Sequence, residues 1–294
     1  MIETLQNIAV EAGKAILEIY NSEDFNVEFK GDGSPLTRAD KAANDVIVKG
    51  LAEHFPNIPV LSEEGKSIPY QERKHWDKFF LVDPLDGTKE FIKRNGEFTV
   101  NIALIENGNP IAGVVYAPVL GRLYACTLDT ASGDWQLATS SELATSDWQL
   151  APSTQHPKAN NQHSATSDWQ LAPSPQHPEA STQKSALKIV ASRSHISAET
   201  EEFIEKMREK HGDVELVSMG SSLKICLVAE GKADVYPRLG PTMEWDTAAA
   251  HAIALAAGCE VLEFDSNKPL VYNKENLLNP FFLVRRGRPL ASSV

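Results

Sequence analysis

Apolar residues recur at helical spacing at the start of the chain, and a similar pattern returns after residue 37. The first stripe consists of Ile2, Leu5, Ile8, Ala9, Ala12, Ile16 and Ile19. This spacing predicts an amphipathic helix over residues 2–20. A second helix is predicted from Thr37, with Asp40 three residues later as in a capping box. Pro56 and Pro59 end this helix before a short strand at 60–61.

Short apolar runs bounded by turn residues follow, and they predict β-strands. In the first part of the chain, strands are expected at 79–82, 99–105, 111–117 and 122–127, with a hairpin turn over 106–109. After residue 186, strands expected at 187–191, 214–217, 233–236, 260–263 and 281–285 alternate with helices expected at 199–211, 221–230 and 246–257. The pattern therefore predicts an α+β half followed by a smaller α/β half.

Three copies of one short unit interrupt the pattern between these halves. Each copy reads Asp-Trp-Gln-Leu-Ala, and the copies begin at Asp134, Asp147 and Asp168. Three copies at unequal spacing are too few and too irregular for a solenoid, and the surrounding Ser, Thr, Gln, Pro and Ala are typical of a low-complexity loop. We interpret the first copy as a strand. The predicted regions are an N-terminal half over 1–137, an inserted loop over 138–183 and a C-terminal half over 184–294.

The composition is that of a globular protein with a marked negative charge. Of the 294 residues, 42% are hydrophobic and 23% are charged, and the net charge is −12. Binding to nucleic acid requires a basic face, so we predict no nucleic-acid partner. An anionic substrate would need bound divalent cations, which reverse the sign of an acidic site.

Several features predict a cytoplasmic protein. Cys126, Cys226 and Cys259 stand in apolar surroundings without metal-ligand spacing, which favours buried free thiols over a disulfide. The first residues are acidic where a signal peptide is basic, and no segment has the apolar length of a membrane span. The basic cluster over residues 285–288 is interpreted as a solvated tail. Peripheral association with the cytoplasmic face of the inner membrane is the minor alternative.

The segment from Lys78 to Phe91 carries the strongest chemical signal. An apolar strand leads into Asp-Pro-Leu-Asp-Gly-Thr over residues 83–88. Two carboxylates this close repel each other unless a hard cation lies between them. Gly87 allows a ligand to approach the backbone, and the following N–H groups can bind an anion. The pattern indicates metal-assisted phosphoester hydrolysis or, alternatively, an ordinary turn that closes a strand.

A second motif lies near the C-terminal end, where Trp245 and Asp246 precede an alanine-rich helix that ends at Gly258. A carboxylate at the start of a helix is favoured as an N-cap and by the helix dipole. The bulky approach Pro-Thr-Met-Glu-Trp over residues 241–245 is unusual for a simple surface cap. Asp246 is therefore a candidate metal ligand as well as a candidate cap.

Together with Leu-Ser-Glu-Glu-Gly over residues 61–65, these motifs resemble the lithium-sensitive, magnesium-dependent phosphatase superfamily that includes inositol monophosphatase. Within it, the chain is most similar to the bacterial 3'(2'),5'-bisphosphate nucleotidases of the CysQ type. The resemblance covers residues 1 to about 128 and about 186 to 284. It implies an α+β / α/β fold, namely the layered αβαβα sandwich of the inositol monophosphatase and fructose-1,6-bisphosphatase type. The insertion departs from the short hairpin that is usual in the superfamily.

The resemblance also implies a set of metal ligands for two, or three, Mg²⁺ ions. Glu63, Asp83 and the Leu85 carbonyl would hold one ion, and Asp83, Asp86 and Asp246 would hold the other. Glu64 is the alternative to Glu63, which matches the first glutamate after the strand. Oxygen ligands of this kind suit Mg²⁺.

Catalytic roles follow from the same resemblance. Thr88 would contact the attacking water and pass a hydrogen bond to Asp40, while Glu63 would contribute to water activation. The amides of Gly87 and Thr88 would hold phosphate oxygens. By the sequence alone, Asp40 is instead only the second half of a capping box.

The resemblance to nucleotidases also implies substrate contacts at Ser221, Lys224, Arg238 and His195, with Asp246 also facing the substrate. Two cations could hold a second phosphate, whereas a surface lysine and an ordinary loop histidine are the alternatives. The resemblance implies hydrolysis of the 3'-phosphate of adenosine 3',5'-bisphosphate in sulfur assimilation, with the 3'-phosphorylated adenylyl sulfate as a further substrate. The alternatives are an inositol or sugar-bisphosphate phosphatase and a catalytically silent metal- and nucleotide-binding protein. Oligomeric state is not predicted.

Overall fold

The computed structural model describes residues 1–22, 28–29, 35–140, 186–191 and 197–287. The helices are α1 (Ile2–Tyr20), α2 (Arg38–His54), α3 (Tyr70–Arg73), α4 (Thr88–Ile92), α5 (Ala198–His211), α6 (Leu223–Ala229) and α7 (Ala248–Ala256). The strands are β1 (Glu28–Phe29), β2 (Pro35–Leu36), β3 (Val60–Ser62), β4 (Lys78–Asp86), β5 (Thr99–Glu106), β6 (Asn109–Ala117), β7 (Arg122–Asp129), β8 (Asp134–Ser140), β9 (Leu187–Ala191), β10 (Val214–Ser218), β11 (Val235–Arg238), β12 (Cys259–Glu263) and β13 (Phe282–Arg286).

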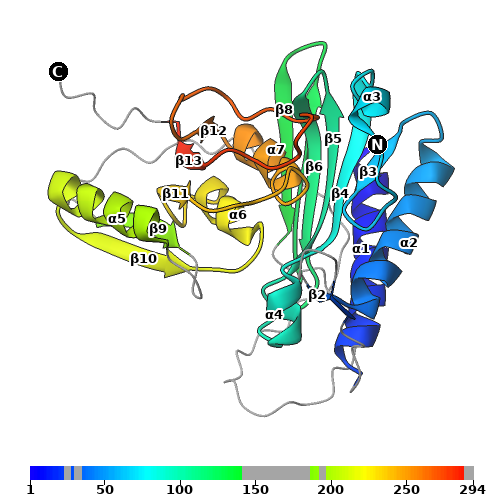
Figure 1. The fold of residues 1–294 in the computed structure, drawn as a ribbon, viewed down its shortest axis with the longest axis horizontal. Helices are drawn as coiled ribbons and strands as arrows, with labels where there is room; N and C mark the ends of the chain where they lie inside the picture. Colours follow the sequence, from blue (N-terminus) through cyan, green and yellow to red (C-terminus); the bar gives the residue numbers. More distant parts are fainter. Residues whose placement is uncertain (23–27, 30–34, 141–185, 192–196, 288–294) are drawn as a thin grey trace, which may run out of the picture.

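These elements form two main sheets in a layered sandwich (Figure 1). In the described part of the chain, the first sheet has the order β3-β4-β5-β6-β7-β8 and the second the order β10-β9-β11-β13-β12. Helices α1 and α2 cover one face of the first sheet, α6 and α7 lie between the sheets, and α5 packs on the second sheet. This arrangement confirms the predicted αβαβα sandwich.

Strand β4 shows why the central strands of the first sheet are mostly apolar on both faces. Phe79 and Leu81 pack in the core shared with α6 and α7, whereas Phe80 and Val82 pack in the core under α1 and α2. Successive side chains of a strand point to opposite faces, so a sheet covered on both faces needs apolar residues at every position. Each fully buried side chain contributes about 1.5–3 kcal/mol.

Helix α7 packs unusually close to β6. A Cβ atom on Gly113 would lie 2.3 Å from the carbonyl oxygen of Ala249 and 2.9 Å from the Cβ of Ala252. Only glycine leaves room for this contact. The small residues of α7 therefore allow this helix, which follows the turn that carries Asp246, to pack directly against the first sheet.

The predicted elements are present with small shifts at their ends. The hairpin turn is confirmed, with Asn107 and Gly108 at φ 50° and 76°, values that suit a tight two-residue turn. The capping box of Thr37 and Asp40 is also present. The short elements α3, β1 and β2 were not predicted, because too few residues carry a periodic signal.

Two interpretations from the sequence need correction or limitation. Arg285 and Arg286 lie in β13, which pairs on both sides, and Arg285 forms an ion pair with Glu260 at 2.7 Å; they are not part of a solvated tail. A strand inside a sheet is determined by ladder pairing, which a basic cluster does not reveal. Strand β8 extends to Ser140, three residues into the predicted insertion, and the remainder of that insertion lies outside the described residues.

The three cysteines are buried free thiols, as predicted. Burial raises the pKa of each thiol above its ordinary value, which keeps the thiols protonated and unreactive. Among the helices that the structure describes, none is long and apolar enough to cross a bilayer.

Candidate active site

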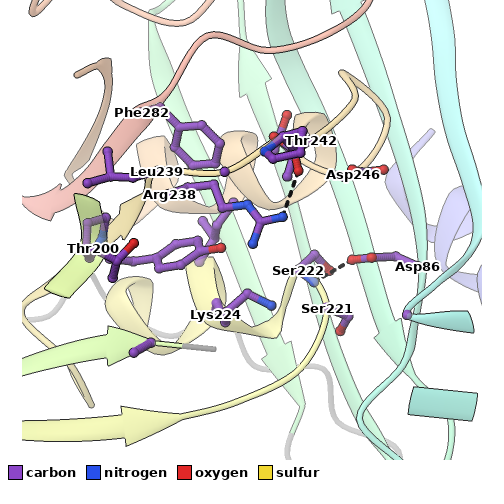
Figure 2. Close-up of a pocket in the computed structure, with 18 of the residues that line it drawn as sticks. Asp86, Thr200, Ser221, Ser222, Lys224, Arg238, Leu239, Thr242, Asp246 and Phe282 are labelled. Carbon is purple, nitrogen blue, oxygen red and sulfur yellow. Dashed lines mark hydrogen bonds between the residues drawn. The ribbon is translucent and has the colours of Figure 1, made fainter. Parts of the chain in front are cut away.

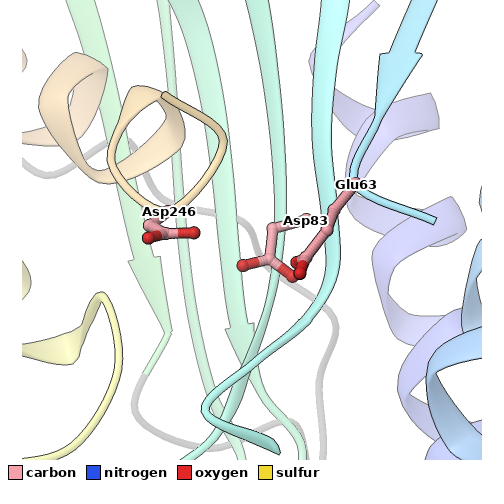
Figure 3. A group of neighbouring side chains, drawn as sticks. All are labelled: Glu63, Asp83 and Asp246. Atoms are coloured by element: carbon pink, nitrogen blue, oxygen red, sulfur yellow. The ribbon is translucent and has the colours of Figure 1, made fainter. Parts of the chain in front are cut away.

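Three carboxylates meet where the two halves of the molecule join (Figure 3). Glu63 follows β3, Asp83 lies in β4, and Asp246 lies in the turn before α7. One oxygen from each side chain lies within 4.8 Å of the others. Asp83 is buried, whereas Glu63 and Asp246 are half-buried. The structure thus brings together three of the predicted metal ligands, and it places Glu63 rather than Glu64 in this group.

The electrostatics of this group favour a bound cation. Burial, followed by the charges of Glu63, Asp86 and Asp246, raises the pKa of Asp83 well above its ordinary value. Burial, followed by the charge of Asp86, raises the pKa of Asp246 to about 8. Like charges that share a buried site disfavour ionisation, and a divalent cation removes that penalty. An oxygen-only donor set fits Mg²⁺.

An irregularity in β4 allows Asp83 and Asp86 to serve one site. Residues three apart point to opposite faces of a regular strand, but the pairing of β4 with β5 shifts register between Asp83 and Asp86. Pro84 lies in this gap and has no N–H to donate. The N–H of Leu85 donates to Oδ1 of Asp83 at 3.0 Å. The strand is therefore longer than predicted and carries the motif within it.

Asp86 lies beside the three carboxylates and is held by hydrogen bonds from both halves of the molecule. Its Oδ2 accepts hydrogen bonds from the Ser222 N–H at 2.5 Å and from Nδ2 of Asn101 at 3.5 Å. The Ser222 hydroxyl donates to Oδ1 of Asn101 at 2.9 Å and lies 2.8 Å from the Thr99 hydroxyl. Burial raises the pKa of Asp86 to about 6.

Sequence reasoning missed the supporting residues Thr99, Asn101 and Ser222. A signal was available for two of them, because Thr99 and Asn101 alternate within an otherwise apolar strand. A buried polar residue in such a strand needs a hydrogen-bond partner. The partner, however, is more than 120 residues away in the sequence, so the pattern shows that a partner exists but not which one.

Asp40 is both a capping residue and a neighbour of Thr88. Its Oδ2 accepts hydrogen bonds from the N–H and hydroxyl of Thr37, at 2.7 and 2.6 Å. Its Oδ1 accepts the Thr88 hydroxyl at 3.2 Å. Burial raises the pKa of Asp40, which makes its carboxylate a better proton acceptor. The two readings of Asp40 are therefore compatible.

Gly87 and Ser221 line the cavity beside Asp86, and both have a positive φ. Gly87 has φ 93° and precedes α4, while Ser221 has φ 47°. A non-glycine residue with positive φ is costly and often marks a functional site. The buried hydroxyl of Ser221 makes no hydrogen bond within the described part of the chain. A substrate oxygen could supply this partner.

A cavity of about 570 Å³ opens next to Asp86 and Asp246 (Figure 2). Lys224 and Arg238, both half-buried, point into it from α6 and β11. An Arg238 nitrogen donates to the Pro241 carbonyl at 2.8 Å. Burial lowers the pKa of Lys224 to about 8. His195 lies outside the described residues, so its predicted role stays a prediction.

The turn around Asp246 differs from the predicted helix cap. Thr247 is the N-cap residue of α7, and Asp246 precedes it. Oδ2 of Asp246 accepts the Met243 N–H at 2.8 Å. The carboxylate therefore closes a turn upstream of the helix, and this geometry directs it toward Asp83 instead of along the helix axis (Figure 3).

The geometry defines an acidic site for a divalent cation beside a cavity with basic groups. Residues 1–287 match the model of the inositol monophosphatase family, and the chain belongs to that family. The chain is 43% identical to the 3'(2'),5'-bisphosphate nucleotidase CysQ of Escherichia coli strain K12, over 97% of this chain and 99% of that protein. It is 34% identical to the protein of the same name from Haemophilus influenzae, over 94% and 89% of the two chains.

Solved structures agree with this assignment. The crystal structure of CysQ from Bacteroides thetaiotaomicron, described as a bacterial member of the inositol monophosphatase family, superposes with a TM-score of 0.75. It is 46% identical, and the match covers 98% of this chain and 97% of that one. The extragenic suppressor protein SuhB from Bartonella henselae, at 20% identity and a TM-score of 0.67 over 97% and 93% of the two chains, shares the fold.

Proposed function

We propose that this protein is a Mg²⁺-dependent 3'(2'),5'-bisphosphate nucleotidase. Its substrate would be adenosine 3',5'-bisphosphate, which it would hydrolyse to AMP and phosphate, with the 3'-phosphorylated adenylyl sulfate as a second substrate. The observation that carries the proposal is an acidic cluster beside a cavity that two cations enter. The full-length similarity to nucleotidases supports it. The proposed setting is sulfur assimilation in the cytoplasm, which the free thiols support.

Metal binding would use the oxygen ligands that surround Asp83. Glu63, Asp83 and the Leu85 carbonyl would hold one Mg²⁺, and Asp83, Asp86 and Asp246 would hold a second. When bound, the ions neutralise the phosphate charge and make water a stronger nucleophile. The raised pKa of Asp83 supports this role, because burial and then the charges of neighbouring carboxylates disfavour its ionised form when no cation is present.

Thr88 and Asp40 would take up the proton of the attacking water. Thr88 donates its own hydroxyl proton to Asp40, so the oxygen lone pairs of Thr88 can accept a hydrogen bond from water. The orientation of the Asp40 carboxylate is fixed, because its Oδ2 accepts two hydrogen bonds from Thr37. This fixed acceptor supports a general-base role for the pair.

The substrate would lie across the junction of the two halves. Gly87 and Thr88 amides and the Ser221 hydroxyl would bind the phosphate that is cleaved, and Asp246 would lie next to the leaving oxygen. Lys224 and Arg238 would bind the second phosphate, since charge-assisted hydrogen bonds to phosphate are strong. Both side chains point into the cavity next to Asp86 (Figure 2).

A phosphate-release panel tests the proposal. Adenosine 3',5'-bisphosphate, adenosine 3'-monophosphate, inositol 1-phosphate and fructose 1,6-bisphosphate would each be assayed with and without Mg²⁺. We expect the nucleotide bisphosphate to have the highest kcat/KM and all turnover to require Mg²⁺. A preference for inositol or sugar phosphate would contradict the nucleotidase assignment, and Mg²⁺-independent turnover would contradict the metal site.

Lys224→Ala and Arg238→Ala sharpen the test. Each variant removes a charge-assisted contact that only the bisphosphate can make, at a cost of about 1.5–3 kcal/mol. The ratio of kcat/KM for bisphosphate over monophosphate should fall about 10- to 150-fold. Arg285→Ala, at a residue that does not line the cavity, is the control and should leave the ratio unchanged. An unchanged ratio in both Lys224→Ala and Arg238→Ala would remove these residues from the site.

A further inference from the structure

The turn that carries Asp246 depends on a segment that lies close to it only in the folded chain. This segment, residues 271–279, belongs to the connection between β12 and β13, which crosses above α7 (Figure 1). The Nδ2 of Asn279 donates to the Met243 carbonyl at 2.8 Å and to the Thr247 hydroxyl at 3.1 Å. The residues on either side of the Asp246 turn are thus held by a single side chain.

Glu244 is the second attachment between the segment and the turn. Its side chain is fully buried. Its carboxylate accepts the N–H of Asn273 at 2.6 Å, the N–H of Lys274 at 3.0 Å and Nζ of Lys274 at 2.6 Å. Because a buried carboxylate is costly without such partners, Glu244 keeps the segment and the turn in one arrangement.

Arg73 ties the same segment to the N-terminal half. It is a buried residue at the end of α3, between Glu63 and Asp83 in the chain. Its guanidinium donates to Oδ1 of Asn273 at 2.9 Å and to the carbonyls of Lys274 and Glu275 at 2.6 and 2.8 Å. Nδ2 of Asn273 in turn donates to the Arg73 carbonyl at 2.8 Å.

We infer that Arg73 is a positioning residue for the metal ligand Asp246. Hydrogen bonds run from Arg73 through Asn273 and Lys274 to Glu244, two residues before Asp246. Glu63 and Asp83 belong to the half that carries Arg73, whereas Asp246 belongs to the other half. The network therefore sets the position of Asp246 relative to Glu63 and Asp83. This inference rests on the proposed metal site.

A stability role alone does not account for this choice of residues. A buried charged network is weak evidence for stability, since apolar residues of similar volume often serve as well. Arginine instead provides several donors in a rigid planar arrangement, and here it binds three acceptors in one short segment. That geometry fixes the path of the backbone, which is what a ligand held on a turn requires.

The test measures Mg²⁺ binding directly, by isothermal titration calorimetry with Mg²⁺ alone. We expect Arg73→Met to weaken Mg²⁺ binding about tenfold, because residues that orient ligands from outside typically change metal affinity 10- to 100-fold. Asn273→Gly should weaken binding in the same direction. It keeps the backbone donor to Glu244 and suits the φ of 69° at this position, so it is expected to fold even where Arg73→Met does not.

Tyr124→Phe provides a matched control. The Tyr124 hydroxyl donates to Glu230 at 3.0 Å, so this variant also removes a hydrogen bond between the first sheet and the end of α6. It should lower the melting temperature in EDTA and leave the Mg²⁺ dissociation constant unchanged. A positioning role predicts a change in Mg²⁺ affinity that this control lacks.

Two results would overturn the inference, and Asp246→Asn separates them. If Asp246→Asn weakens Mg²⁺ binding while Arg73→Met and Asn273→Gly bind Mg²⁺ within about twofold of wild type, far short of the 10-fold minimum effect expected, the network is only structural. If Asp246→Asn itself binds Mg²⁺ as wild type does, the proposed metal site is wrong and the inference falls with it.

Discussion

The two halves of the molecule hold their carboxylates by different means. Strands β3 and β4 pair in parallel with Ser62 opposite Val82, so Glu63 and Asp83 emerge side by side from adjacent strands (Figure 3). Asp246 instead lies on a turn that is bonded to the distant segment 271–279. Glu244 in the turn accepts the Asn273 N–H, and Asn279 donates to the Met243 carbonyl.

Backbone pairing within the sheet therefore positions Glu63 and Asp83, whereas side-chain hydrogen bonds position Asp246. The pairing of β3 with β4 lies at one edge of the first sheet, but Leu61, Leu81 and Val82 belong to the buried core, and core strands are the last structure to open. A turn held by a few hydrogen bonds opens at lower cost. The site is therefore expected to be most sensitive to changes that move Asp246 while leaving the first sheet intact.

The largest effect is expected from Asp83→Asn, which removes the ligand shared by both proposed ions. Turnover should fall at least about a thousandfold, since metal stabilisation of the transition state contributes several kcal/mol. In EDTA the variant should be more stable than wild type by about 1–3 kcal/mol, because a crowded buried carboxylate is relieved. Phosphate release and thermal melting in EDTA measure the two effects. Near-normal turnover in the folded variant would refute the shared-ligand assignment.

Gly113→Ala tests whether the packing of α7 on the first sheet positions Asp246. The new methyl group would overlap the carbonyl of Ala249, so α7 must move away from the first sheet. We expect a loss of about 3 kcal/mol in unfolding free energy, together with weaker Mg²⁺ binding. Gly240→Ala, where the nearest atom is 4.0 Å away, is the control for stability. If stability falls but Mg²⁺ affinity does not, the packing of α7 does not position Asp246.

His251, on the helix that follows the Asp246 turn, makes the stability of this region depend on pH. It is buried on α7, 2.8 Å from the Tyr272 hydroxyl, and burial lowers its pKa to about 3. Above pH 6.5 it is neutral in both states. As pH falls below 6.5, the unfolded chain binds a proton that the folded chain excludes, so stability falls toward pH 3. At pH 5, the titration of His251 lowers the free energy of unfolding by about 2 kcal/mol relative to its value at neutral pH.

His251→Asn should abolish this part of the acid sensitivity. Urea unfolding at pH 7 and pH 5 in EDTA compares the two proteins, and the carboxylates of the acidic cluster titrate equally in both. An identical pH dependence for wild type and variant would show that His251 titrates in the folded protein.

The smallest effect is expected from removal of residues 142–184, which lie outside the described residues. Their polar, low-complexity composition offers little core to lose, and the entropy of loop closure changes slowly with length, by about 0.6 kcal/mol per doubling. Turnover should stay within about twofold. Replacement of the same residues by a Gly-Ser linker of equal length is the control. A large loss of turnover in both variants would show that the segment supports the site.

Much of the site could be read from local sequence. Asp83, Asp86 and Thr88 lie in one short motif after an apolar strand, and the Thr37–Asp40 capping box is a local pattern with its own hydrogen bonds. The roles of Arg73, Asn101 and Glu244 could not be read, because partners that define them are distant in the sequence. Asn273 lies 29 residues from Glu244, Ser222 lies 121 residues from Asn101, and the partners of Arg73 lie about 200 residues away. The assignment of Arg285 and Arg286 to a tail failed because the strands that pair with β13 also lie elsewhere in the sequence.

The sequence by itself determined the helices of regular apolar period, the strands buried on both faces and the chemical nature of the ligands, since these follow from residue type and spacing. Only the tertiary structure decided that Glu63, Asp83 and Asp246 meet, that β4 shifts register between Asp83 and Asp86, and that Arg73 reaches the segment that holds Glu244. Such contacts depend on which elements pack together. The packing of the elements is determined by the summed burial of the whole core. It leaves no periodic signal in the sequence at the residues that make these long-range contacts.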